Sequence, residues 1–153
     1  MERRNFLKLG AVAIVATSTQ TMANDIKDNT PYTKYRDKIY NRNHYQKSDK
    51  ATKGELKHTP EIKIGNVDNK GYTLIEITIG QEGIIHPSTK EHWIDFIELE
   101  GDGQLLARTF FEPGTSMGYV AYKVKLNGIK KLIAREGCNK HGIWEETIEL
   151  KKN

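Results

Sequence analysis

The residues best suited to chemistry are four histidines and the single cysteine, which all fall near the ends of apolar segments. They are His58, His86, His92, His141 and Cys138. Imidazole nitrogens and a thiolate sulfur are donors for first-row transition metals. Cys138 and His141 are three residues apart, and Gly142 suits a tight turn that lets both side chains reach one ion. The sequence therefore predicts a metal site built from loops. The fifth histidine, His44, lies in a polar segment away from these positions.

The donor set narrows the identity of the metal. Structural zinc usually takes four ligands, whereas a thiolate with several imidazoles suits iron, copper or zinc. A type 1 copper site is the alternative, and it would make the protein an exported electron-transfer metalloprotein without catalytic activity. That site usually needs two histidines, a cysteine and a weak axial methionine downstream of the cysteine. Here Met1, Met22 and Met117 all precede Cys138, and there are more histidines than copper needs.

Short strands are expected to hold these loops from Glu61 onward. The expected strands are 72–79, 93–100, 104–111, 119–126, 130–135 and 143–150. Gly101-Asp102-Gly103 and Asn127-Gly128 are typical of tight hairpin turns. Six or seven short strands, with turns about every 8 to 12 residues, predict an all-β fold of the antiparallel sandwich or barrel type.

Residues 1–23 have the pattern of an export signal. Arg3-Arg4 precedes Phe6-Leu7-Lys8, and a short apolar run and small residues follow. This order resembles the twin-arginine type, which exports folded proteins. The apolar run is too short to span about 30 Å of hydrocarbon, so no stable membrane anchor is expected. The prediction is a periplasmic protein cleaved after Ala23.

An exported protein with one cysteine needs an explanation for its thiol. Thiols usually pair in oxidising compartments, so Cys138 is a buried structural residue, half of an intermolecular disulfide or a protected thiolate. Metal binding in the cytoplasm, followed by export of the folded protein, would protect the thiolate.

Composition argues against nucleic acid as a partner. The chain has 153 residues and a formal net charge of +4, which is enough length for one domain with its own core. No basic stripe with interleaved aromatic residues appears. Residues 24–57 form a polar, lysine-rich N-terminal segment without a clear period, and residues 58–153 form the predicted metal-binding domain.

Three motifs resemble one known family, the iron domain of superoxide reductases (neelaredoxins and desulfoferrodoxins). The motifs are Lys57-His58-x-Pro60, His86-Pro87-x-Thr89-x-Glu91-His92 and Cys138-Asn139-x-His141-Gly142-Ile143-Trp144-Glu145. They occur in the family's order, and the resemblance covers residues 54–150. It implies an immunoglobulin-like antiparallel β-sandwich of about seven strands with one mononuclear iron, ferrous or ferric. No cysteine precedes Cys138, so the chain resembles the one-iron type.

The resemblance also implies the ligands and the reaction. The imidazoles of His58, His86, His92 and His141 would bind iron in a plane, with Cys138 as the axial thiolate and the opposite face open. The implied activity is one-electron reduction of superoxide to hydrogen peroxide. An external electron donor, such as a small redox protein, and a homo-oligomer are implied as well.

Two residues before His58 are catalytic candidates. Lys57 matches the family's lysine and would attract superoxide. The family commonly has Glu-Lys-His, with the glutamate able to cap the open position in the oxidised state. Leu56 occupies the glutamate's place in this chain, and Glu55 stands one residue earlier, so Glu55 is the carboxylate candidate.

Overall fold

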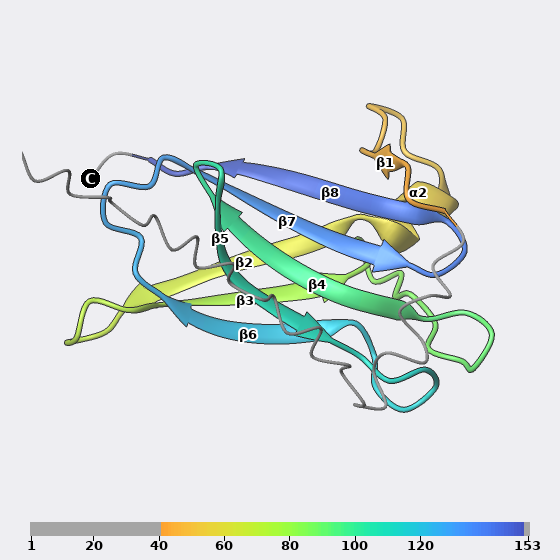
Figure 1. Cartoon of the computed structure of the whole chain (residues 1–153). Coiled ribbons are helices and arrows are strands. Elements are labelled where there is room, and N and C mark those ends of the chain that lie inside the picture. The colour runs from red at the N-terminus through yellow and green to blue at the C-terminus, as the bar shows by residue number, and fades with distance from the viewer. Residues whose placement is uncertain (1–40, 152–153) are drawn as a thin grey trace, which may run out of the picture.

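Two β-sheets that face each other make up most of the computed structural model, which describes residues 41–151 (Figure 1). The strands are β1 His44–Tyr45, β2 Pro60–Val67, β3 Thr73–Ile79, β4 Ile94–Gly101, β5 Gln104–Phe110, β6 Tyr119–Val124, β7 Lys131–Cys138 and β8 Gly142–Glu149, and the helix is α2 Lys53–His58. The larger sheet has the order β1-β8-β7-β4-β5, and the smaller has the order β2-β3-β6. Strands β2 to β8 pair antiparallel, and β1 pairs parallel to β8. The prediction of an all-β antiparallel sandwich is confirmed.

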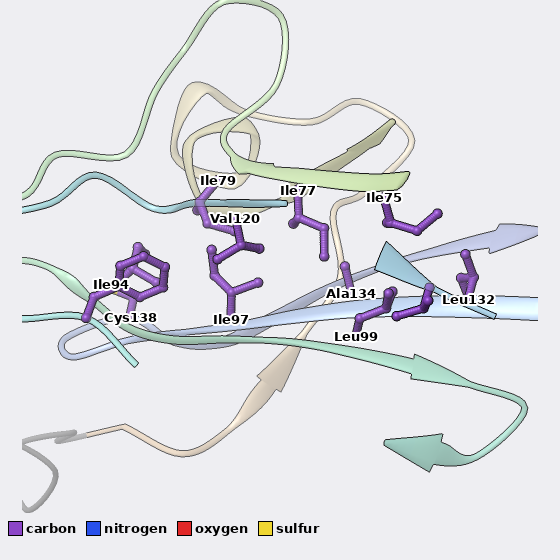
Figure 2. Packing of buried hydrophobic residues seen from close by; sticks show 12 residues of the cluster. Ile75, Ile77, Ile79, Ile94, Ile97, Leu99, Val120, Leu132, Ala134 and Cys138 are labelled. Carbon is purple, nitrogen blue, oxygen red and sulfur yellow. The ribbon is translucent and has the colours of Figure 1, made fainter. Parts of the chain in front are cut away.

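The hydrophobic core lies between the two sheets. Side chains on one face of β3, among them Ile75 and Ile77, point toward Ile97 and Leu99 of β4 (Figure 2). All four are completely buried, as expected for alternate residues of strands with one face in the core. Cys138 belongs to the same cluster and lies at one end of it, so the core holds the thiol in place.

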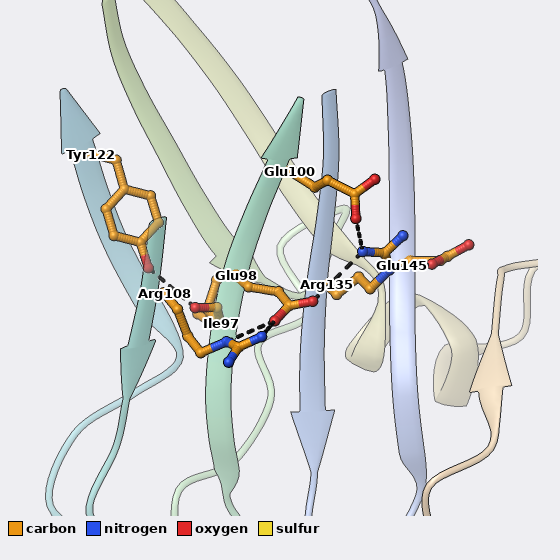
Figure 3. A network of polar contacts seen from close by, with 7 residues as sticks. All are labelled: Ile97, Glu98, Glu100, Arg108, Tyr122, Arg135 and Glu145. Atoms are coloured by element: carbon orange, nitrogen blue, oxygen red, sulfur yellow. Dashed lines mark hydrogen bonds and ion pairs between the residues drawn. The ribbon is translucent and has the colours of Figure 1, made fainter. Parts of the chain in front are cut away.

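A network of ion pairs joins the strands on the outer face of the larger sheet (Figure 3). The Arg135 guanidinium on β7 pairs with Glu100 on β4 and Glu145 on β8. Arg108 on β5 donates to Glu98 on β4 through both Nε and Nη2. Arg108 lies directly opposite Glu98, and Arg135 directly opposite Glu145, while Arg135 reaches Glu100 diagonally. Opposite charges paired across adjacent strands in this way stabilise the register. The register of β7 in turn fixes the position of Cys138.

Two short elements precede the first long strand. Strand β1 has two residues and lies beside β8, while α2 has six residues and is separated from β2 by Thr59 alone (Figure 1). The helix crosses the predicted boundary between segment 24–57 and the domain. That division stays a prediction, because half of the segment, 24–40, and the whole export signal, 1–23, lie outside the described residues. Within residues 41–151, no helix is long and apolar enough to cross a membrane.

Candidate metal centre

His58 is the last residue of helix α2. The helix starts with a capping box, in which Thr52 Oγ1 accepts the Glu55 backbone N–H and the Glu55 carboxylate accepts the Thr52 N–H. Such a box satisfies N–H groups that a helix start leaves without partners. At the other end, His58 is 3% exposed and begins the turn into β2. The expectation of a loop position is therefore wrong for His58.

The buried side-chain amide of Asn139 hydrogen-bonds the residues beside Cys138 to the residues on either side of His92. Asn139 Oδ1 accepts the Trp93 N–H at 3.0 Å, and Asn139 Nδ2 donates to the Glu91 carbonyl at 3.0 Å. The Asn139 N–H also donates to the Trp93 carbonyl. Asn139 is part of a sequence motif, but its bridging role was not predicted. An asparagine between a ligand-type cysteine and histidine is the signal that could have suggested it.

The loop expectation also fails for Cys138 and holds for the other three histidines. Cys138 is the last residue of β7, and Gly142, with φ +93°, opens β8. His141 lies in the turn between them, while His86 and His92 lie between β3 and β4. Strand and helix ends fix a side chain more firmly than loop interiors do.

The four predicted histidines form a closed ring of imidazoles. Neighbouring ring centroids are 4.8 Å apart for His58–His86, 4.5 Å for His86–His92, 4.7 Å for His92–His141 and 4.7 Å for His141–His58. Every neighbouring pair meets edge to face, with interplanar angles of 69° to 77°. The opposite rings of His58 and His92 are 6.1 Å apart. His44 is not part of this ring.

The nitrogens of three of these rings converge beside the cysteine sulfur. His141 Nδ1 lies 3.0 Å from His58 Nε2, 3.1 Å from His92 Nε2 and 3.5 Å from Cys138 Sγ. Donor atoms of these four residues all lie within 4.8 Å of one another, a spacing that could hold a metal ion. His86 Nε2 is buried without a hydrogen-bond partner. A buried polar atom without a partner is rare and calls for an explanation, and a metal bound inside the ring would supply one.

Two of the imidazoles are oriented by their outer nitrogens. His58 Nδ1–H donates to the Gly54 carbonyl at 2.6 Å, and His86 Nδ1–H donates to the Pro87 carbonyl at 2.7 Å. These bonds leave Nε2 of each ring with a free lone pair. Metal-binding histidines are usually oriented in this way by a backbone or carboxylate acceptor.

Burial keeps the imidazoles neutral and the thiol protonated in the metal-free protein. Burial, together with the nearby His141 and Lys57, lowers the pKa of His58 to about 4. It lowers the pKa of His86 to about 3 and that of His92 to about 4. Burial and the neighbouring Glu136 raise the pKa of Cys138 to about 11. The imidazoles are therefore ready to bind a cation, whereas the thiol must first lose a proton.

Metal binding is expected to release about one proton per ion between pH 6 and 9, with affinity rising about tenfold per pH unit. The proton comes from Cys138, since the pKa values of His58, His86 and His92 lie well below this range and that of His141 is lowered by burial as well. Calorimetry of Co²⁺ binding in buffers of different ionisation enthalpy measures the release. Cys138→Ser is the control and should release almost none. Release of two or more protons by the natural protein would contradict this account of the imidazoles.

Of the two catalytic candidates, Lys57 acts electrostatically on the four imidazoles and the Cys138 thiol, whereas Glu55 is hydrogen-bonded at the start of the helix. The Lys57 ammonium contributes to lowering the pKa of all four imidazoles and of the thiol, so its charge is felt across the cluster. The Glu55 carboxylate instead accepts the backbone N–H groups of Thr52 and Ser48, at 2.7 and 3.0 Å. These bonds lower the pKa of Glu55 to about 2. Glu55 lies outside the group of converging donors in the described residues.

Glu55→Ala is expected to lower the melting temperature by a few degrees and to leave the metal affinity unchanged within about twofold. The loss follows from breaking the capping box, which contributes to the stability of a short helix. Thr52→Ala removes the other half of the box and is the matched control. A changed metal affinity or an altered visible spectrum of the metal-bound protein in Glu55→Ala, but not in Thr52→Ala, would show that the carboxylate acts at the metal.

Comparisons with known proteins agree with this geometry. A family model described as desulfoferrodoxin matches residues 49–147, more than half of the chain. A superoxide reductase from Pyrococcus abyssi is 39% identical over 110 residues, which cover 64% of this chain and 90% of that protein. A desulfoferrodoxin from Nitratidesulfovibrio vulgaris is 37% identical over 90 residues, and the chain spans 60% of its length. The solved superoxide reductase from Giardia intestinalis has a TM-score of 0.54 at 31% identity, covering 61% of this chain and 98% of that one. The chain belongs to the desulfoferrodoxin family of iron proteins.

Proposed function

We propose that this protein is a superoxide reductase whose iron is held by His58, His86, His92, His141 and Cys138. The observation that carries the proposal is the closed ring of four imidazoles with the cysteine sulfur beside it. A type 1 copper site would leave two of these imidazoles without a function, because it usually takes two histidines. The family and the relatives named superoxide reductases favour the same reading.

The residues present fit a first-row metal ion. Imidazole nitrogens bind such ions at about 2.1 Å, so two nitrogens at right angles on one ion lie about 3 Å apart. The inward nitrogens of His58 and His92 lie 3.0 and 3.1 Å from that of His141. The buried Nε2 of His86 has no other partner. Iron bound to these donors would supply one-electron chemistry by alternating between its ferrous and ferric states.

The donor set also suits a small anionic substrate. Four neutral imidazoles and one thiolate would leave a divalent ion with a net charge of about +1, and the Lys57 ammonium adds a positive charge nearby. His141 is exposed and His92 is half-buried, so the cluster can be reached from solvent. Superoxide would therefore be drawn to this end of the sandwich rather than to its apolar core.

Each chain residue has a distinct part in the proposed reaction. The Cys138 thiolate donates electron density, which favours release of the reduced product, and the N–H groups of Lys140 and His141 moderate this donation by hydrogen bonds to sulfur. Lys57 attracts the anion and holds water that can deliver a proton. Reducing superoxide to hydrogen peroxide consumes one electron and two protons. The electron must come from an external one-electron donor, for which we propose a small redox protein.

Metal analysis combined with a visible spectrum tests the proposal. Protein purified under gentle conditions should contain about one iron per chain and show a thiolate-to-iron charge-transfer band on oxidation. Stoichiometric copper with no iron would contradict it. Zinc alone, with no band in protein supplied with ferrous iron, would do so as well.

We also propose that the protein is exported after folding with its metal bound, which rests on Arg3-Arg4 and on the unpaired Cys138. Changing both arginines to lysine is expected to leave the protein in the cytoplasm with its iron content unchanged, because the recognition signal is lost and the site is not. Cell fractionation with metal analysis measures both. Unchanged export of the variant would show that another route is used.

A further inference from the structure

We infer that Trp144 and Tyr45 form an aromatic clamp that positions two of the metal donors, His58 and His141. The inference rests on the ligand set proposed above and adds two positioning residues to it. Neither ring belongs to the hydrophobic core cluster of the described residues. Their contacts run instead to each other and to the candidate metal centre.

Trp144 touches two donors that come from distant parts of the chain. Its indole stacks on the His58 ring, with centroids 5.4 Å apart and planes 22° from parallel. Its Nε1–H donates to the His141 carbonyl at 3.1 Å. His58 is carried by helix α2 and His141 by the turn between β7 and β8. One side chain therefore fixes the ring of the first donor and the backbone of the second.

The hydrogen bond from Trp144 to the His141 carbonyl also influences the hydrogen bonds that the Cys138 sulfur accepts. The N–H groups of Lys140 and His141 donate to Cys138 Sγ, so the orientation of this turn sets the hydrogen bonds that the thiolate accepts. Trp144 holds the peptide group on the other side of His141. Loss of the indole would let the turn move and would change the electron donation of the thiolate.

Tyr45 stacks on the indole as well. The Tyr45 and Trp144 rings are stacked, with centroids 5.1 Å apart and planes 27° from parallel. The Tyr45 hydroxyl accepts hydrogen bonds from the side-chain amides of Asn41 and Asn43. The indole of Trp144 thus stacks on both Tyr45 and His58.

Backbone pairing places Tyr45 in this position. Strand β1 pairs with β8 so that Tyr45 lies beside Trp144, and the Ile143 N–H donates to the Asn43 carbonyl at 2.8 Å. Gly142 permits this approach, because a Cβ there would lie 2.7 Å from both the Asn43 carbonyl oxygen and the Tyr45 ring. The glycine of the Cys138–Gly142 turn therefore leaves room for the clamp.

Binding of Co²⁺ to the full-length, metal-free protein tests the clamp, with affinity and the thiolate-to-cobalt charge-transfer band as readouts. Trp144→Leu is expected to weaken binding about tenfold or more and to shift the band, as loss of partners that orient ligands does. Trp144→Phe keeps a ring over His58 but loses the donor to His141, so it should shift the band with a smaller loss of affinity. Tyr45→Leu should weaken binding, whereas Tyr45→Phe should behave like the natural protein. Tyr119→Leu, on β6, removes a tyrosine outside the clamp and should change neither readout.

The outcomes separate the clamp from a general effect on folding and from the proposed function. A band that stays in place in Trp144→Phe and Trp144→Leu, with affinity falling only in step with the melting temperature of the metal-free protein, would overturn the clamp. Natural affinity in Trp144→Leu would overturn it as well. If the natural protein itself bound neither Co²⁺ nor iron and gave no thiolate band, the proposed function would fail and the clamp with it.

Discussion

Replacing Cys138 with serine is expected to abolish the thiolate-to-metal charge-transfer band, and replacing any one of the four ring histidines with alanine to strip most of the iron. The sulfur is the only thiolate in the chain, so no other residue can give the band. Each imidazole is one side of a closed ring, and its loss removes a donor and breaks two edge-to-face contacts. The expected loss of iron affinity is well over tenfold, since mutating even the partners that orient a ligand costs about 10- to 100-fold.

His44→Ala is the matched control for this series. His44 is an exposed histidine on β1, outside the ring of imidazoles, so its variant should contain iron like the natural protein. The measurement is the iron content per chain of each variant after identical purification. A His44→Ala protein without iron, or a His86→Ala protein that keeps it, would show that the ligands are assigned wrongly.

The second large effect is expected at Lys57, where alanine should slow the second-order reaction with superoxide about tenfold or more. The Lys57 charge acts on every one of the five candidate donors, and electrostatic steering changes association rates by factors of about 10 to 1,000. Pulsed generation of superoxide at several salt concentrations measures the rate constant. The natural protein should slow more with rising salt than the variant, because salt screens the charge that the variant lacks.

Lys53→Ala tests whether this effect is specific. Lys53 is exposed at the first position of the same helix, and its removal changes the net charge by the same amount. Its charge is not among the causes that shift the pKa values of the donors, so its variant should keep the natural rate and salt dependence. Identical salt dependence for Lys57→Ala and the natural protein would rule out steering by Lys57.

Six of the seven long strands could be predicted from the sequence because their alternation reflects burial on one face, whereas β2, which is mostly exposed, was not among the expected ranges. In β6, Val120 and Val124 are buried while Ala121 and Lys123 are exposed, as the alternating pattern indicates. The end of β7 was missed. Its expected boundary was Arg135, yet the strand continues to Cys138, and Glu136 is completely buried in it. A buried carboxyl next to the site is a tertiary feature that local hydrophobicity does not reveal.

The elements before β2 were harder to predict for different physical reasons. Strand β1 has two residues, and only its pairing with β8 makes it a strand. Helix α2 is too short to show a helical period, although Thr52-x-x-Glu55 is a capping-box pattern that could have suggested it. That pattern would also have assigned Glu55 to the helix start. The ligand-type residues could be identified because few histidines and one cysteine are present, whereas the aromatic clamp depends on β1 and could not.

The product balance of the reaction with superoxide tests the central claim most directly. Thiolate donation from Cys138 would stabilise a ferric ion held at the proposed site and make that ion a poor oxidant of superoxide, so each turnover should need an electron from outside. Reduced protein is mixed with superoxide, with and without an external donor, and peroxide and dioxygen are quantified. The account predicts one peroxide for each superoxide consumed, no dioxygen from the protein-catalysed path, and turnover that ends when the donor is exhausted. Sustained turnover without a donor, giving equal amounts of peroxide and dioxygen, would contradict it and identify a dismutase. Oxidation of the protein without faster loss of superoxide would contradict it as well and identify an electron carrier.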